Sequence, residues 1–235
     1  MLNLRLNVAI FLSLSFSTLA LSQVGIKYDI NASNPLAVVA AMDKFYSSPT
    51  GQAASGSVTL YQYMANGDNP ATHAFLVSFS NLEEMQQTFT RNALSQDWTN
   101  FLAELNMASD QIDSVMYRAT GISGGDPSKV TSPNTANYWI YLNVSDPATY
   151  ASAWQTLTNK NDDLDVASGL SEILADGASN VTRVIAQRAN DLPSLLGRTN
   201  SQLVGWDDFV ESVSSIRTVV SRDMLGQVKT WSASN

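Results

Sequence analysis

Residues 31–35, Asn-Ala-Ser-Asn-Pro, return 112 positions later as Asn-Val-Ser-Asp-Pro at residues 143–147. Both copies of this motif follow an apolar, strand-like run and open a helix-like one. An Asn, Asp or Ser side chain can cap the free N–H groups of a first helical turn, and Pro is tolerated at the first helical position. We therefore predict that the motif marks the same strand-to-helix junction in two copies of one unit.

The similarity between the two copies continues downstream of this motif. The spacing between matched segments changes only near predicted helix ends, as expected for a duplication followed by divergence. The further matches are residues 57–59 with 180–182, 65–70 with 189–193, 76–79 with 203–206, and 113–115 with 223–225.

Hydrophobic periodicity predicts the order strand, helix, strand, strand, helix, strand in each copy. In the first copy the predicted elements are residues 25–30, 35–47, 57–64, 73–80, 82–106 and 112–120. In the second copy they are residues 137–143, 147–160 with a further helical piece to residue 175, 180–188, 201–205, 208–220 and 222–231.

This order predicts an α+β fold made of two tandem ferredoxin-like β-α-β-β-α-β units. Helices should cover one face of each antiparallel sheet, and the two remaining faces can bury each other. The arrangement resembles the dimeric α/β-barrel superfamily, with the dimer fused into one chain. The predicted segments are a signal peptide (1–22), a first repeat (23–120), a linker rich in Gly, Ser, Pro and Thr (121–136) and a second repeat (137–235).

The chain begins like an exported protein. Arg5 precedes an apolar run from Val8 to Leu21, and small residues follow up to Ser22, a pattern typical of a signal peptide. The run is shorter than the ~20 apolar residues that a membrane span needs. We therefore expect cleavage near Ser22 and a secreted or periplasmic protein with no membrane association afterwards. The sequence has no cysteine, so packing and hydrogen bonds rather than disulfides must stabilise it.

Charge argues against nucleic acid as a partner. The chain has 13 basic and 21 acidic residues, and loss of Arg5 with the signal peptide leaves 12 basic residues and a net charge of −9. Such a surface repels phosphate backbones. Because the duplication supplies the usual dimer partner within the chain, we expect a monomer.

Aromatic and basic residues in the predicted strands are the candidates for ligand binding. Alternation sends part of this set between the two sheets, where tyrosine and arginine could orient a small polar or anionic organic molecule. The alternative is that the rings simply fill the interface. The predicted ligand-binding residues are Tyr28, Tyr61, Tyr63, His73, Tyr117, Arg118, Tyr141 and Arg183.

The sequence assigns no catalytic residue and predicts no cofactor or metal site. Residues 121–125 match G-x-S-x-G, but a linker rather than a helix follows the serine. The resemblance implies that haem is conceivable, because some members of the superfamily bind it, but His73 is the only histidine. Three function classes stay open: a small-molecule-binding protein, a cofactor-independent oxygenase or isomerase of the dimeric α/β-barrel type, and a non-catalytic interaction module.

Overall fold

The computed structural model describes residues 24–177, 179–197 and 202–233, so the predicted signal peptide lies outside the described residues. The first repeat contains β1 (Val24–Ala32), α1 (Pro35–Tyr46), α2 (Pro49–Gln52), β2 (Ser57–Ala65), β3 (His73–Phe79), α3 (Leu82–Ala93), α4 (Gln96–Ala108) and β4 (Ser109–Gly124). A short 3-10 helix, η1 (Pro127–Lys129), leads to the second repeat. That repeat contains β5 (Ala136–Val144), α5 (Pro147–Asn159), β6 (Ala167–Ala175), β7 (Arg183–Ala189), α6 (Leu192–Leu196), α7 (Trp206–Val213) and β8 (Arg217–Ser232).

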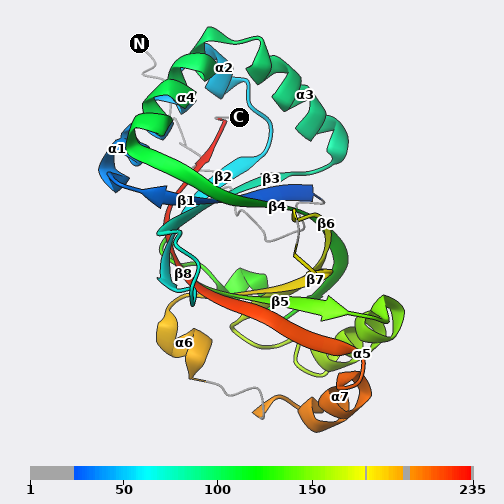
Figure 1. Ribbon diagram of the computed structural model, residues 1–235. Coiled ribbons are helices and arrows are strands. Elements are labelled where there is room, and N and C mark those ends of the chain that lie inside the picture. The colour runs from blue at the N-terminus through cyan, green and yellow to red at the C-terminus, as the bar shows by residue number, and fades with distance from the viewer. Residues whose placement is uncertain (1–23, 178, 198–201, 234–235) are drawn as a thin grey trace, which may run out of the picture.

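The strands form one closed barrel in the order β1-β3-β2-β8-β5-β7-β6-β4, and the paired neighbours run antiparallel. Figure 1 shows the strands of the two repeats facing each other, with α1, α3 and α4 outside one half and α5, α6 and α7 outside the other. This confirms the predicted α+β fold with two sheets packed face to face.

Two long strands close the barrel by pairing with both repeats. β4 and β8 each have 16 residues. The first half of β4 pairs with β1 of its own repeat and the second half with β6 of the other repeat. In the same way β8 pairs first with β5 and then with β2. The duplication therefore produces two equivalent seams between the repeats.

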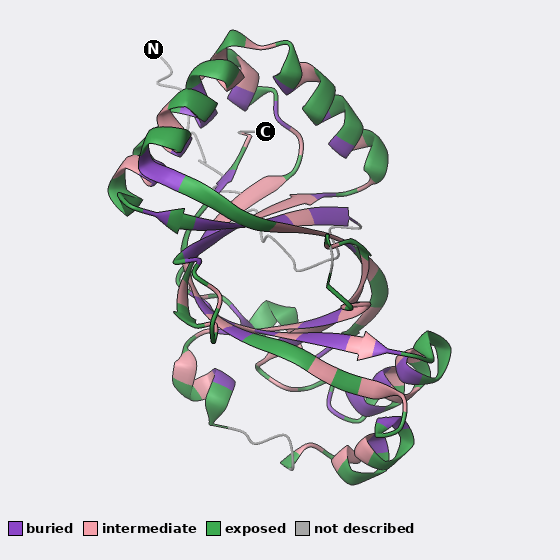
Figure 2. Ribbon diagram, viewed as in Figure 1, coloured by how far each residue is buried: buried purple, intermediate pink, exposed green. Residues whose placement is uncertain are grey.

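The duplicated motif caps a helix in both repeats, as predicted. The side chain of Asn34 accepts a hydrogen bond from the Ala37 N–H at 3.2 Å, and Asp146 accepts one from the Thr149 N–H at 3.1 Å. Pro35 and its counterpart at 147 occupy the first helical position. The capped helices bury their apolar faces against the sheets. The buried parts of these helices are purple in Figure 2.

The segment before β7 differs from the prediction. Residues 167–175 were predicted as helix, but they form strand β6. The strand predicted at residues 180–188 is present as β7, and it pairs with β6 instead of with residues 201–205. Leu170 in β6 is buried under the helices at 1% exposure, and the strand is paired on both sides, by β4 and β7. Pairing on both edges outweighs the helical preference of Leu, Glu and Ala in this segment.

Two further predicted elements also differ in their bounds. Residues 203–205 are not a strand: Gly205 has φ +81° and starts α7, and residue 201 lies outside the described residues. The single predicted helix 82–106 is two helices, because α3 ends at Ala93 and the Ser95 side chain caps α4 by accepting the Trp98 N–H at 3.3 Å.

Candidate functional site

Alternation along the strands defines which side chains face the space between the sheets. On β5, Trp139 and Tyr141 point inward and pair with Ala186 and Val184 on β7. They belong to a buried group, here called the inter-sheet cluster, whose members are exposed by 6% or less: Tyr61, Ala74, Trp139, Tyr141, Val184 and Leu225. Because a water-filled cavity would leave these side chains accessible, this part of the barrel is closely packed.

A buried ion cluster of Lys27, Asp29, Tyr63 and Asp223 lies against these aromatic rings. Lys27 Nζ is 3.1 Å from Asp29 Oδ1 and 3.3 Å from Asp223 Oδ2, and it donates a hydrogen bond to the Tyr63 hydroxyl at 2.8 Å. The Tyr63 hydroxyl donates to Asp29 Oδ1 at 2.6 Å. Lys27, Asp29 and Asp223 are each exposed by 4% or less. Since Lys27 belongs to the first repeat and Asp223 to the second, the cluster joins the two repeats.

Aromatic faces complete the surroundings of the Lys27 ammonium. Its Nζ lies 5.0 Å from the centre of the Tyr141 ring and 5.6 Å from that of Trp139, within the range of cation–π attraction. Burial alone would lower the pKa of Lys27, but Tyr141, Tyr63, Asp29 and Asp223 outweigh burial and hold the pKa well above its usual value. Burial raises the pKa of Asp223, although Lys27 opposes this shift.

These electrostatics disfavour a nucleophilic role for Lys27 at neutral pH. A lysine that attacks a carbonyl needs a lowered pKa, because only the neutral amine is nucleophilic. Lys27 is instead a fully charged ammonium whose nearest polar neighbours already bind it. The ion cluster therefore links the two repeats through paired charges.

The structure divides the eight predicted ligand-binding residues into two groups. Four of them, Tyr61, Tyr63, Tyr117 and Tyr141, lie on the inner face of the barrel. The other four face away from it. Tyr28 packs on the core beneath α1 and α4, His73 is 6% exposed on the same outer face, Arg118 binds Glu172 on the surface, and Arg183 donates to the Thr182 carbonyl.

Sequence reasoning missed the charged residues of the barrel interior. Lys27 and Asp29 flank Tyr28, so choosing Tyr28 selected the wrong face of β1. Arg183 was likewise chosen on β7, whereas Arg188 is the arginine on the inner face of that strand. Gly25, two residues before Lys27, could have indicated which face of β1 points inward. It is buried on the inner face, where a Cβ would clash with the Tyr117 hydroxyl.

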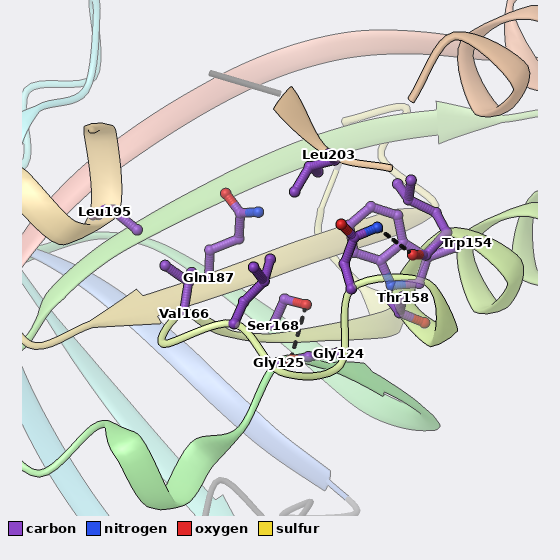
Figure 3. Close-up of a pocket in the computed structure, with 12 residues that line it drawn as sticks. Gly124, Gly125, Trp154, Thr158, Val166, Ser168, Gln187, Leu195 and Leu203 are labelled. Atoms are coloured by element: carbon purple, nitrogen blue, oxygen red, sulfur yellow. Dashed lines mark hydrogen bonds between the residues drawn. The ribbon is translucent and has the colours of Figure 1, made fainter. Parts of the chain in front are cut away.

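A cavity lies outside the barrel, between α5, α6 and the outer face of the second sheet (Figure 3). This helix–sheet pocket has a volume of about 60 Å³. Its walls are mostly apolar, with a few polar side chains. The lining residues are Gly124, Gly125, Trp154, Leu157, Thr158, Asn161, Leu164, Val166, Ser168, Gln187, Leu195 and Leu203.

Two polar side chains of the helix–sheet pocket have no hydrogen-bond partner in the described part of the chain. Trp154 is 4% exposed and its indole N–H is buried without an acceptor. The Gln187 amide faces Trp154 across the pocket in Figure 3. By contrast, the Asn161 amide donates to the Leu157 carbonyl at 2.8 Å, and the Ser168 hydroxyl donates to the Gly124 carbonyl at 3.3 Å. The pocket therefore offers one free donor and one free amide.

The residues of this pocket do not fit haem. Haem iron in proteins is held by His, Cys, Met or Tyr, and none of these lines the pocket. His73 is in the first repeat, where its Nδ1 lies 2.9 Å from the Thr72 hydroxyl. Within residues 24–177, 179–197 and 202–233, no three His, Asp or Glu side chains come together as a metal site. In the same residues no helix is long and apolar enough to cross a membrane.

Comparison with known proteins gives similarity of fold and no similarity of sequence family. No protein-family model and no curated protein matches the chain. A putative monooxygenase from Lactobacillus acidophilus has a TM-score of 0.56 at 11% identity, covering 89% of this chain and 95% of its own. An anthrone oxidase-like protein has a TM-score of 0.56 at 9% identity, covering 90% and 94%.

A chlorite dismutase from Candidatus Nitrospira defluvii, solved as a mutant, has a TM-score of 0.51 at 10% identity. That match covers 89% of this chain and 92% of the dismutase. At such identities the likeness concerns the path of the backbone alone. These neighbours are members of the dimeric α/β-barrel superfamily, and this chain has their fold.

Proposed function

We propose that this protein is exported and binds a small organic molecule, and that the helix–sheet pocket of the second repeat is the binding site. The observation that carries the proposal is the indole N–H of Trp154, which is buried at a cavity and has no acceptor. A buried donor without a partner costs about 1–3 kcal/mol. A bound acceptor atom would remove that cost.

The lining of the pocket defines the kind of ligand. Leu157, Leu164, Leu195 and Leu203 favour an apolar body, while Trp154 calls for one hydrogen-bond acceptor. Ligand pockets for drug-sized molecules have about 300–1,000 Å³. A cavity of about 60 Å³ suits a compact ligand of a few heavy atoms.

This location differs from the sequence-based expectation, which put the ligand between the two sheets. What supports the change is that the inter-sheet cluster is packed, with exposures of 6% or less, whereas the helix–sheet pocket holds unfilled volume. The lining also lacks a titratable side chain, so binding is better supported than catalysis.

Native mass spectrometry of the protein purified from its own host tests the proposal. We expect an additional mass that is lost on denaturation, and an N-terminus near residue 23. Trp154→Phe removes the free donor. The bound fraction should then fall at least about tenfold, because the ligand loses a hydrogen bond between neutral groups. Trp206→Phe is the matched control, because Trp206 packs on the same Phe209 ring but does not line the pocket.

A clean ligand-free mass for the wild-type protein would contradict the binding proposal and favour an interaction module. Equal occupancy in Trp154→Phe and Trp206→Phe would place the ligand elsewhere.

A cofactor-independent oxygenase is the second candidate function. It is favoured by two structural neighbours, described as a putative monooxygenase and an anthrone oxidase-like protein. Oxygen uptake with anthrone as the probe tests it: uptake that exceeds the uncatalysed rate would support an oxygenase, and uptake equal to the uncatalysed rate would contradict one.

A further inference from the structure

The barrel interior holds a second cation, Arg188, which is half-buried and whose surroundings differ from those of Lys27. Arg188 on β7 pairs with Asn137 on β5, and it shares its face with Ala186, which pairs with Trp139 of the inter-sheet cluster. Because paired antiparallel residues project to the same side, the Arg188 side chain enters the space between the sheets. Its exposure is intermediate, so part of the side chain is accessible to solvent.

No carboxylate neutralises Arg188 in the part of the chain that the structure describes. The ion pairs of the described residues do not include it, and its buried Nε has no hydrogen-bond partner. Lys27, in contrast, is surrounded by two carboxylates and the Tyr63 hydroxyl. Burial lowers the pKa of Arg188, but from a usual value so high that the guanidinium stays charged at neutral pH.

The charge is also specific to the second repeat. Ser78 pairs with Gly25 on β1 in the first repeat, as Arg188 pairs with Asn137 in the second. An unpaired, half-buried guanidinium costs desolvation free energy. The first repeat has Ser78 at the equivalent position, so the fold of a repeat does not require a cation there. The cost is explained if an anion binds there.

Neighbouring residues supply a second polar group and room for a ligand. Tyr61 interacts electrostatically with Arg188, and burial raises the pKa of Tyr61 to about 12, so its hydroxyl keeps its proton. Gly169 on β6 pairs with Ala186, and no atom lies within 4 Å of where a Cβ of Gly169 would stand. Small residues therefore leave open space on the inner face beside the guanidinium.

We propose that Arg188 anchors a small organic monocarboxylate on the inner face of the barrel, in the open space beside Gly169 and at the edge of the packed inter-sheet cluster, with the Tyr61 hydroxyl as a second polar group on the side of that cluster. A guanidinium binds a carboxylate through two parallel N–H···O bonds, which are among the stronger hydrogen bonds in proteins. A single cation suits one negative charge better than a phosphate dianion. Trp139 pairs with Ala186, two residues before Arg188 on the same face of the sheet, and an aromatic ring at that position suits an organic ion.

Isothermal titration calorimetry with acetate, butyrate, benzoate and phenylacetate in a carboxylate-free buffer tests this site. At least one of the four probes should bind the wild-type protein, and its neutral amide should bind at least about tenfold more weakly, because it lacks the charge-assisted bonds. Arg188→Gln should weaken binding at least about tenfold, whereas Arg188→Lys, which keeps the charge but loses the fork, should weaken it less.

Arg183→Gln is the matched control, because Arg183 lies on the same strand but faces away from the interior. Its affinity for the probe should stay within about twofold of wild type, as expected for a residue outside the site. The ligand-free Arg188→Gln protein should also melt at a higher temperature than wild type, since an unpaired, half-buried charge is removed. Circular dichroism confirms that each variant is folded.

Four results would overturn the proposal: no binding of any probe, equal binding of an acid and its amide, unchanged binding in Arg188→Gln, or tighter binding of inorganic phosphate than of every carboxylate. The site is separate from the helix–sheet pocket. Trp154→Phe should therefore leave carboxylate binding intact, so that failure of one proposal does not decide the other.

Discussion

Lys27 shows at the scale of one residue how a buried charge can stabilise this fold. Its side chain is 4% exposed and is the only cation within 4 Å of Asp29 or Asp223 among the described ion pairs. Lys27→Met keeps most of the side-chain volume but leaves two buried carboxylates without a counter-ion. We expect a loss of about 3–5 kcal/mol in the free energy of unfolding, measured with urea.

The control for this substitution is Lys44→Met. Lys44 pairs with Glu104 on the surface, where its side chain is 70% exposed. Exposed pairs contribute about 0–1 kcal/mol, so this variant should unfold close to wild type. Equal losses in the two lysine variants would show that the buried ion cluster has no special weight in stability.

Asp223 makes one component of the stability depend on pH. Its pKa is raised in the folded protein, mainly by burial, so the folded state binds a proton more tightly than the unfolded state. The resulting stabilisation is complete below the unfolded pKa of about 3.8 and is lost as the pH rises through the folded pKa.

Asp223→Asn removes this titration, so the stabilities of wild type and Asp223→Asn should depend differently on pH. Between pH 4 and pH 7, the melting temperature of wild type relative to Asp223→Asn should fall. Asp43, whose pKa is lowered by Lys229 and Trp231, contributes with the opposite sign in both proteins and cancels in the difference. A flat difference profile would mean that Asp223 does not take up a proton on folding.

At the scale of elements, local signals predicted what local interactions decide. The strand-to-helix junctions at Asn34 and Asp146 were predicted because one side chain and one proline suffice to start a helix. Strand β6 was mistaken for a helix because its pairing with β4 involves residues far away in the sequence, at the end of the first repeat.

The candidate sites follow the same rule. Of the eight predicted ligand-binding residues, Tyr61, Tyr63, Tyr117 and Tyr141 lie between the sheets. Alternation along a strand predicts that only part of such a set points inward, and ligand binding by these residues stays a prediction. Which of two neighbouring residues points inward depends on which face the whole strand turns to the other sheet. The sequence does not show this for β1, so Tyr28 was chosen instead of Lys27 and Asp29. The helix–sheet pocket joins α5, β6, β7 and α6 and left no pattern in the sequence.

At the scale of the whole molecule, the two repeats depend on each other for their burial. The seams β4–β6 and β2–β8, the inter-sheet cluster and the Lys27–Asp223 ion pair all cross between them. A repeat that separated from its partner would expose Tyr61 and Ala74, or Trp139 and Val184, together with unpaired strand edges. Exposing apolar surface costs about 25 cal/mol per Å², so a state with one folded repeat should be unfavourable.

We therefore expect one cooperative unfolding transition although the chain contains two repeats. Tryptophan fluorescence reports on both halves, because Trp98 and Trp231 pack in the first core and Trp154 and Trp206 in the second. Its urea transition should coincide with that of far-ultraviolet circular dichroism, as in two-state domains. In the double variant Trp154→Phe/Trp206→Phe, the remaining tryptophans lie only in the first core and the barrel. The midpoints from fluorescence and circular dichroism should still agree in this variant. Separate midpoints for the two probes would instead show that each repeat folds alone, and the seams would then be contacts between finished domains.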